Sequence, residues 1–514
     1  MTNKLQYNPS LLAIYLDDTS ISFLDKAPFW EFWILMAKKI HSIFPALPIF
    51  IRSKYLKIPD EIIKKINLTI DPNSNTELEF LLKVGEALPP SKFQDPDWDE
   101  ICFLYLTGIS PLLDIDLTKE QWDRHKRFFS QYSYSENIPE GLIPKVLTRE
   151  FLSSIPKTGN IESHSFLLKN INLYDVDIFF KSPDLRQYRL DFRDRSSRDR
   201  FLLKNFLLHS EQLIYDQILP TLEIHPEWFR PYPSYLEWEI YQGCEKSCTF
   251  CPRQSMDLSK DGTKVTLKEV EEFLEKLEDW HPGTMTVSLG GNGEPFLNPD
   301  VFHILERLTK SEIVTELIIE TALYTKISEF KEWISAIPEI QKNKICLIVN
   351  LSTLIPERYL DLYGTGSLES VLDSAKSLLP ILGKEKLLIQ MLKIMEVHDE
   401  IENFFNSLEK LGFSVILQKY NRFAGRMIEK RVSDLTPIKR EFCWHLVRDL
   451  YCNADGSVSL CKQTFDQSAG NWKTEELSEI WERGYEAYTK SFVGKHQNTN
   501  LPCIACDEWY TFNA

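Results

Sequence analysis

The chain has 514 residues, of which 43% are hydrophobic and 26% charged, and its formal net charge is −16. This composition is typical of a globular protein of about two to four domains, and the acidic charge argues against nucleic-acid or anionic-membrane binding as its main activity. No apolar run approaches the roughly eighteen residues of a membrane span, and no signal peptide is recognisable. We therefore expect a cytoplasmic protein in which clustered cysteines bind metal rather than form disulfides.

Residues 1–222 are expected to form a first domain of the α/β class. Apolar, β-prone runs occur at residues 11–16, 47–51, 101–106 and 176–180, and residues 28–43 have the periodicity of an amphipathic helix. This alternation predicts a parallel sheet with helices on its faces. Asp17 and Asp18 follow the first strand, where the start of a helix is favoured over a metal-binding pair. The prolines at 226, 231 and 233 indicate a linker.

Residues 223–430 contain a second alternating series, which predicts a partial (β/α)6 barrel. Its expected strands cover residues 235–241, 284–289, 315–320, 345–351, 387–392 and 414–418, and its expected helices residues 267–277, 301–308, 368–379 and 400–411. The first strand leads directly into a group of cysteines. In a barrel of parallel strands this position is the carboxyl-terminal face, where active sites lie.

These cysteines, Cys244, Cys248 and Cys251, have the spacing C-x3-C-x2-C. Three thiolates so close together can hold one [4Fe–4S] cube and leave its fourth iron without a protein ligand. Such an open position is where a substrate or cofactor can bind, as in catalytic zinc sites. The alternative is a structural zinc knuckle, for which His281 is the nearest later candidate for a fourth ligand.

A glycine-rich motif, Gly290-Gly291-Asn292-Gly293-Glu294-Pro295, follows the second strand of the barrel. Glycines permit close approach of a ligand to the backbone, and a carboxylate beside them can accept hydrogen bonds from an ammonium group. With the cysteine triplet, including Phe250 before its last cysteine, this motif resembles the radical S-adenosylmethionine (SAM) superfamily over roughly residues 235–420.

The resemblance implies SAM as a cofactor, with Gly291, Gly293 and Glu294 around its methionine end and Phe250 beside the cluster. Ser352 is similar in position to the family's ribose-contacting residue, and Asn350, Gln390 and Lys393 are further candidates for the cofactor pocket. For these four residues, ordinary polar positions at strand ends are the alternative. In the mechanism implied, SAM chelates the open iron, and one electron cleaves it to a 5′-deoxyadenosyl radical that takes a hydrogen atom from the substrate. A reductase or a flavodoxin- or ferredoxin-type protein would supply the electron.

Residues 431–514 form the expected third, cysteine-rich domain, with Cys443, Cys452, Cys461, Cys503 and Cys506. Asp455-Gly456 is a strong hairpin-turn signal between residues 450–453 and 457–460, and this hairpin would bring Cys461 back towards Cys443. Four thiolates can enclose one iron–sulfur cluster or one structural zinc. Cys452 competes with Cys443 as the first ligand. Cys102 and Cys346 lie within apolar runs and are expected to be buried core thiols.

This pattern, with an expected helix at residues 477–481, resembles the SPASM/twitch extension of radical SAM enzymes. Because the chain has no cysteines after Cys506, it looks closer to the shorter twitch form. The resemblance implies a second, auxiliary [4Fe–4S] cluster on Cys443, Cys461, Cys503 and Cys506, with zinc as the alternative. Enzymes of this group act on peptides or on sugar-like alcohols, so either substrate class is expected.

The first domain weakly resembles sugar nucleotidyltransferases of the cytidylyltransferase type, which have a Rossmann-like sheet. The resemblance rests on residues 107–114, 138–144 and 189–191 and on Asp199. The glycine- and arginine-rich phosphate loop is missing, and Ile109 and Arg193 stand where the family has acidic residues. Without these carboxylates Mg²⁺ has no anchor, so a domain without transferase activity is predicted. The arginines of residues 186–200 alternate with aspartates, which indicates a solvated, self-paired face.

The three domains together resemble a group of spirochaete SPASM proteins. Two other functions remain open. One is a zinc-stabilised binding protein without radical chemistry. The other is an active sugar nucleotidyltransferase with a regulatory cluster domain.

Overall fold

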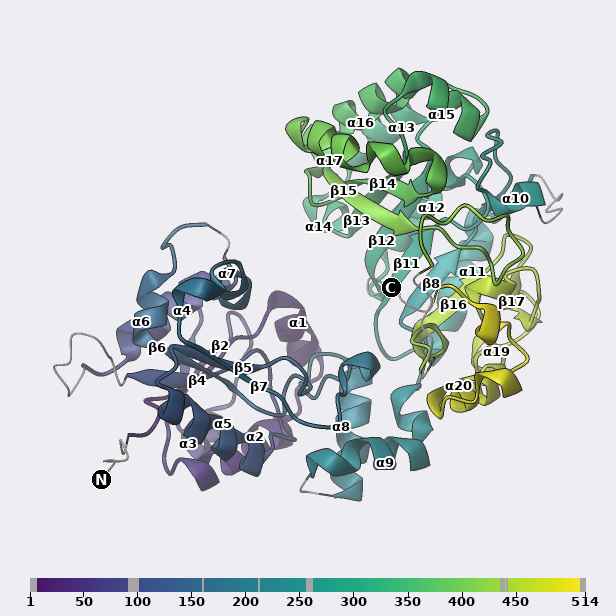
Figure 1. Cartoon of the computed structure of the whole chain (residues 1–514). Helices are drawn as coiled ribbons and strands as arrows, with labels where there is room; N and C mark the ends of the chain where they lie inside the picture. Colours follow the sequence, from purple (N-terminus) through teal and green to yellow (C-terminus); the bar gives the residue numbers. More distant parts are fainter. Residues whose placement is uncertain are drawn as a thin grey trace. The chain divides into compact units, whose positions relative to one another are not determined.

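The computed structural model describes residues 7–90, 101–159, 161–210, 213–255, 262–434, 440 and 442–508. The chain divides into two compact units, Met1–Phe229 and Arg230–Ala514, shown in Figure 1. The first unit extends beyond the boundary predicted at residue 222, because Pro226–Phe229 forms a 3₁₀ turn that contacts helices α8 and α9. The second unit contains both of the cysteine groups.

The first unit is built on a mixed sheet of seven strands. In spatial order these are β3 (Leu68–Asp71), β2 (Ile49–Arg52), β1 (Leu12–Ile14), β4 (Cys102–Leu106), β6 (Lys145–Thr148), β5 (Tyr132–Ser135) and β7 (Val176–Phe179). Neighbouring strands are parallel except that β6 runs antiparallel to β4 and β5. The predicted α/β class is confirmed, although the sheet is mixed rather than parallel. Strands β3, β5 and β6 were not predicted, because each mixes polar with apolar residues over only four positions.

Helices connect and cover these strands. They are α1 (Asp18–Lys26), α2 (Trp30–Ile43), α3 (Asp60–Lys65), α4 (Glu77–Ala87), α5 (Ile115–Phe128), α6 (Arg149–Ser154), α7 (Ser163–Lys169), α8 (Ser197–His209) and α9 (Ile218–Ile224). The chain winds outward from β1 through β2 to β3 and then returns to place β4 on the other side of β1. The carboxyl ends of β1 and β4 therefore form a topological switch point, where open α/β sheets bind ligands.

The second unit contains a sheet of nine strands, of which six form the predicted (β/α)6 partial barrel. These six neighbours are all parallel. They are β8 (Tyr235–Trp238), β11 (Met285–Leu289), β12 (Val314–Thr321), β13 (Ile345–Asn350), β14 (Leu387–Lys393) and β15 (Ser414–Lys419). The helices between them are α11 (Leu267–Trp280), α12 (Val301–Lys310), α13 (Ile327–Ala336), α14 (Glu339–Lys342), α15 (Pro356–Tyr363), α16 (Leu368–Leu382) and α17 (Ile401–Lys410).

Side-chain alternation along the barrel strands separates the core from the interior face. Leu236 and Trp238 of β8 pack with apolar residues of the helices in one continuous core. The side chains between and after them, Glu237 and Glu239, point to the opposite face because strand residues alternate. The interior of the barrel is therefore polar, and it is here that the cavities described below lie.

The cysteine-rich region continues the barrel sheet. Strand β16 (Asp449–Cys452) pairs in parallel with β8, and β17 (Ser457–Ser459) and β18 (Gly470–Asn471) extend the sheet by antiparallel pairing. The predicted hairpin turns at Gly456, whose φ of 90° suits glycine. Its attachment to β8 was not predicted. Helices α18 (His445–Arg448), α19 (Leu477–Arg483) and α20 (Tyr485–Phe492) complete the region. None of the helices in the described ranges is long and apolar enough to span a bilayer.

Candidate functional site

The loop that carries Cys244, Cys248 and Cys251 follows β8 and the short strand β9 (Tyr241–Gln242), at the carboxyl-terminal face of the barrel. Backbone hydrogen bonds attach it to the end of α15: the amide of Ser247 donates to the carbonyl of Tyr363 (3.2 Å) and that of Thr249 to Leu362 (2.9 Å). Gly364, in the left-handed conformation at φ 76°, leaves room for this contact, since a Cβ there would lie 2.0 Å from the Ser247 hydroxyl. Helix α15 thus fixes the loop.

The three thiols of this loop influence one another. Burial, together with the neighbouring thiols of Cys251 and Cys244, raises the pKa of the Cys248 thiol to about 12. Burial also raises the pKa of Cys251, with Cys244 acting in the same direction. Three sulfurs crowded in this way favour a bound cationic centre, because an iron cluster would offset the repulsion between their thiolates.

Basic and phenolic side chains surround the same loop. Lys246 is buried and donates hydrogen bonds to the hydroxyl of Tyr359 (2.8 Å) and the carbonyl of Thr365 (3.0 Å). The hydroxyl of Tyr324 accepts a bond from the amide of Glu245 (3.1 Å) and lies 3.7 Å from the Cys244 sulfur. The sequence analysis did not identify these residues, because nothing in their spacing links them to the cysteines.

The glycine-rich loop packs on the backbone that precedes Cys244. The amide of Glu294 donates to the carbonyl of Gly243 (2.8 Å). A Cβ at Gly293 would lie 1.8 Å from the carbonyl oxygen of Tyr241, so only glycine fits there. Gly291 has a φ of 81°, which also favours glycine. The two predicted motifs are therefore in direct backbone contact.

Glu294 is buried, with 3% of its surface exposed, and burial raises the pKa of its carboxyl group. One oxygen accepts from the hydroxyl of Thr321 (2.7 Å) and the amide of Phe296 (3.2 Å), and the other accepts from the amide of Ala322 (2.9 Å). A carboxylate oxygen can accept two hydrogen bonds, so the second oxygen retains capacity for a ligand. These contacts hold the carboxylate in one orientation.

One cavity, of about 220 Å³, joins the two motifs. It is lined by Cys244, Lys246, Cys248, Phe250, Cys251, Pro252, Gly290, Gly291, Asn292, Gly293, Glu294, Glu320, Thr321, Ala322, Asn350, Ser352, Tyr363, Gln390 and Leu392. All the residues predicted for the cofactor therefore lie around one space, except Lys393, which is not among the lining residues. Strands β8, β11, β12, β13 and β14 each contribute at their carboxyl ends.

Ser352 follows β13 and is held in place by two donors. Its hydroxyl oxygen accepts from the amide of Leu392 (3.1 Å) and from the hydroxyl of Tyr363 (3.2 Å). Its own hydroxyl proton is then available to a ligand in the cavity. Asn350 and Gln390 are hydrogen-bonded to each other at 2.8 Å, also at the cavity wall. The ring of Phe250 packs edge-on to Tyr363, with centroids 5.4 Å apart.

Replacing Glu294 with glutamine should weaken SAM binding about 10- to 100-fold. The variant removes a charge-assisted hydrogen bond to an ammonium group, a contact of about 1.5–3 kcal/mol. Anaerobic calorimetry with SAM measures the dissociation constant, and iron content controls for cluster loss. The variant Glu316→Gln on β12, outside the cavity lining, is the matched control. Unchanged affinity in the Glu294 variant would contradict the predicted contact.

His281, the candidate fourth zinc ligand, forms hydrogen bonds to residues other than the cysteines. It caps the C-terminus of α11, before β11 begins, whereas the cysteines follow the end of β8. One ring nitrogen contacts the carbonyl of Pro233 (2.5 Å), and the other accepts from the amide of Gly283 (3.1 Å). The expectation that His281 could complete a zinc knuckle is therefore wrong.

The structure gathers four of the C-terminal cysteines. Burial raises the pKa of Cys443 and of Cys461, and for both the thiols of Cys503 and Cys506 raise it further. The pKa of Cys452 is raised by burial alone. Cys452 lies with Leu450 on the face of β16 that joins the apolar core. The pairing of Cys461 with Cys443 rather than Cys452 follows the ligand set expected from the sequence.

Within the described ranges, no three His, Cys, Asp or Glu side chains converge closely enough to surround a single metal ion. The thiolates of a cubane bind different irons, so they lie farther apart than the roughly 3.8 Å between sulfurs around one tetrahedral zinc. Cys102 and Cys346 are buried, as predicted, with 1% and 7% of their surface exposed.

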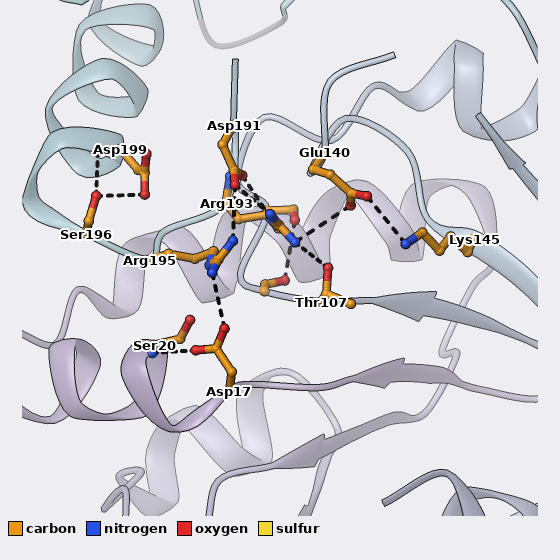
Figure 2. A network of polar contacts seen from close by, with 12 residues as sticks. Asp17, Ser20, Thr107, Glu140, Lys145, Asp191, Arg193, Arg195, Ser196 and Asp199 are labelled. Carbon is orange, nitrogen blue, oxygen red and sulfur yellow. Dashed lines mark hydrogen bonds and ion pairs between the residues drawn. The ribbon is translucent and has the colours of Figure 1, made fainter. Parts of the chain in front are cut away.

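A polar network occupies the switch point of the first unit, as Figure 2 shows. Arg193 donates two hydrogen bonds to the carboxylate of Asp191 (2.8 and 2.5 Å) and one to the hydroxyl of Thr107 (2.5 Å), directly after β4. Gly108 makes room for it, since a Cβ there would lie 2.9 Å from the Cβ of Arg193. The Arg193 side chain is only 12% exposed. The expected self-pairing is present, but at Arg193 it is buried rather than solvated.

The two aspartates after β1 have structural partners. Asp17 caps helix α1 by accepting from the amide of Ser20 (2.7 Å), and Asp18 pairs with Arg52 at 2.6 Å. The helix-start interpretation of Asp17 is confirmed. Deeper in the same region, burial and the neighbouring Asp191 carboxylate raise the pKa of Asp199 to about 7.

Comparison with known proteins gives two family-model matches, both in the second unit. Residues 238–408 match the family model of the radical SAM superfamily, and residues 443–507 match that of the SPASM iron–sulfur cluster-binding domain. A protein of Treponema pallidum (strain Nichols), described as uncharacterized, is 25% identical over 360 residues, which cover 67% of this chain and 96% of that protein.

Among solved structures, Streptococcus suis SuiB bound to precursor peptide SuiA is 16% identical, with 67% of this chain and 82% of that chain covered and a TM-score of 0.43. BtrN in complex with AdoMet and 2-DOIA is 15% identical, with 52% and 91% covered and a TM-score of 0.35. These likenesses are too distant to bear on what this chain binds.

The family matches fall on the two regions where the cysteines converge. Residues 238–408 are accordingly a radical SAM domain, which implies a [4Fe–4S] cluster and SAM, and residues 443–507 are a SPASM domain, which implies an auxiliary iron–sulfur cluster.

Proposed function

We propose that the second unit cleaves SAM reductively and abstracts a hydrogen atom from a peptide or sugar-like substrate. The observation that carries this proposal is the single cavity lined by Cys244, Cys248 and Cys251 on one side and by Gly291, Gly293 and Glu294 on the other. When bound, the cluster and SAM together supply an electron and a 5′-deoxyadenosyl radical.

The residues of the chain bind and orient these groups. The three cysteines hold three corners of the cube, and Glu294 accepts from the ammonium of SAM. Ser352 donates its hydroxyl proton towards the ribose, and Phe250 covers the cluster loop. Lys246 and Tyr324 fix the cysteine loop through bonds to Thr365 and Glu245. The buried walls exclude water from the reacting groups.

The auxiliary cluster is assigned to Cys443, Cys461, Cys503 and Cys506, whose thiols affect one another's pKa. The three cysteines at the barrel mouth leave one iron open, whereas four cysteines here would close the cluster. Its role would be electron transfer rather than SAM cleavage. We further propose that a reductase or a flavodoxin- or ferredoxin-type protein supplies electrons.

The direct test is anaerobic reconstitution of the full chain, reduction with dithionite and chromatography of the SAM reaction. Formation of 5′-deoxyadenosine and methionine is expected. A protein with its iron and sulfide in place that forms no 5′-deoxyadenosine would refute the proposal. A protein that takes up zinc and no iron would instead support the zinc-stabilised binding protein.

For the first unit we propose a nucleotidyltransferase-like domain in which internal ion pairs have replaced the metal–nucleotide site. The support is the position of Arg193 at the switch point, bonded to Asp191 and 3.7 Å from Glu140 (Figure 2). A guanidinium at this place neutralises carboxylates that Mg²⁺ would require. The full chain incubated with CTP, Mg²⁺ and sugars should release no pyrophosphate. Release would support the transferase alternative.

Replacing Arg193 with methionine should lower the free energy of unfolding by about 2–3 kcal/mol. The substitution leaves Asp191 and Glu140 without their shared cation in a largely buried position. Urea unfolding of the full chain measures the change. The control is Arg186→Met, because Arg186 pairs with Asp184 at the surface and its side chain is 56% exposed. Equal stability of the Arg193 variant and wild type would show that the network is not structural.

A further inference from the structure

A second cavity, of about 100 Å³, adjoins the cofactor cavity. The two share Pro252, Gly291 and Asn292 as common walls. Pro252 follows Cys251, and Lys462, which also lines the second cavity, follows Cys461. The second cavity therefore adjoins the loops of both cysteine groups.

The charged groups of this cavity are two carboxylates and one ammonium, Glu237, Glu239 and Lys462. Lys462 donates to Glu237 at 2.9 Å, and its side chain remains 38% exposed, so its ammonium group keeps further hydrogens that a ligand could accept. Glu239 accepts from the amide of Asn292 at 3.0 Å. The cavity carries an excess of negative charge when both carboxylates are ionised.

The ionisation of the Glu239 carboxyl group depends on the charge of its neighbours. Burial raises its pKa to about 7, while hydrogen bonds from the amides of Asn292 and Ala454 lower it. A positively charged group in the cavity would favour the ionised form and so bind to it more strongly. On the adjacent side, Glu320 lines the cofactor cavity, where burial raises the pKa of its carboxyl group and the charge of Lys462 acts in the opposite direction.

The remaining walls of the second cavity include both polar and aromatic side chains. Asn453 contributes an amide, while Phe423 and Phe465 meet edge to face with ring centroids 5.4 Å apart. Such aromatic walls can cover the C–H face of a ring, and the polar groups can bind its hydroxyls. The cavity is well below the roughly 300–1,000 Å³ of pockets that hold drug-sized ligands.

Given the radical SAM activity proposed above, we propose that this second cavity binds the reacting part of a small polyhydroxylated substrate that carries a positively charged amine. Glu237 and Glu239 recognise the amine, and Lys462 and Asn453 bind hydroxyl oxygens. The proposal selects an amino-bearing polyol over a peptide as the substrate class.

The test uses the reconstituted full-length enzyme with SAM, dithionite and a metabolite extract from cells of the source organism grown in heavy water. Hydrogen abstraction from a labelled substrate places deuterium in 5′-deoxyadenosine, which mass spectrometry detects. The extract is separated by size and by ion exchange. Portions are treated with a protease mixture or with periodate, which oxidatively cleaves the bond between neighbouring carbons that carry hydroxyl or amino groups.

We expect deuterium transfer from the small-molecule fraction that a cation exchanger retains, with activity that survives the protease and is destroyed by periodate. Transfer that the protease abolishes, or that comes from an anionic or neutral fraction, would overturn the inference. Formation of 5′-deoxyadenosine that contains no deuterium with any fraction would also overturn the inference, but it would leave the proposed function standing. Absence of 5′-deoxyadenosine from iron-loaded enzyme refutes the proposed function itself.

The variant Glu237→Gln should lower deuterium transfer about tenfold at unchanged iron content, because it removes one charge-assisted contact. Glu316→Gln is the matched control: Glu316 lies on the same face of β12 as Glu320, and its side chain is 42% exposed, 3.9 Å from Lys386. Equal transfer in both variants would contradict the role of Glu237. If the Glu237 variant instead loses iron in proportion to the lost transfer, Glu237 stabilises the loop of the auxiliary cluster. That result would overturn its proposed role in binding the amine.

Discussion

Replacing Cys248 with alanine is expected to abolish 5′-deoxyadenosine formation and to remove about four iron atoms per chain. The loop offers three cysteine ligands. We expect a cluster that is held by only two of them to be lost during purification. The Cys248 thiol lines the cofactor cavity and is coupled to Cys244 and Cys251. Iron and sulfide analysis and chromatography of the SAM products measure both effects.

The matched control for this prediction is Cys346→Ala. Cys346 lies on β13, is buried, and has no cysteine among the groups that raise its pKa to about 11. Its replacement should leave iron content and 5′-deoxyadenosine formation at wild-type levels. A Cys248 variant that still cleaves SAM would remove this thiol from the cluster site, because no other cysteine lines that cavity besides Cys244 and Cys251 in the part of the chain that the structure describes.

The second large effect concerns the auxiliary site. Replacing Cys461 with alanine should remove about four iron atoms while the SAM-cleaving cluster and its spectrum remain. The reason is that the Cys461 thiol shares its surroundings with Cys443, Cys503 and Cys506, but not with the cavity that holds the other triplet. Iron content and electron paramagnetic resonance of the reduced protein distinguish one cluster from two.

Cys452→Ala is the decisive companion variant, since Cys452 is only nine positions before Cys461 but belongs to the apolar core. It should retain both clusters. If Cys443→Ala retains the auxiliary cluster and Cys452→Ala loses it, then Cys452 is the ligand in place of Cys443. Zinc in place of the lost iron would favour the closed zinc site that four thiolates also suit.

Much of the site was accessible from the sequence because its motifs are short and follow strands. Cys244, Cys248 and Cys251 lie within one loop, so their spacing alone limits what they can hold. The glycine–glutamate motif follows β11, the parallel neighbour of β8, and parallel neighbours end on the same side. Strand order therefore brought the two motifs together without any information about side-chain packing.

The sequence left other questions open because they depend on which face of a strand is buried. Cys452 competed with Cys443 as the first ligand, and the alternation of β16, which turns Cys452 with Leu450 into the core, favours Cys443. The parallel pairing of β16 with β8 joins segments more than two hundred residues apart. No local pattern predicts such a pairing.

By itself the sequence determined the class of chemistry, since ligand type and local spacing define which metal centre a loop can bind. The tertiary structure decided what surrounds that chemistry: the guanidinium of Arg193 at the switch point of the first unit, and the contact of Lys462 with Glu237 in the second. The ion pairs of Arg193 with Glu140 and of Lys462 with Glu237 join charged side chains far apart in the sequence. Their formation depends on burial and on strand order, which arise only when the whole chain packs.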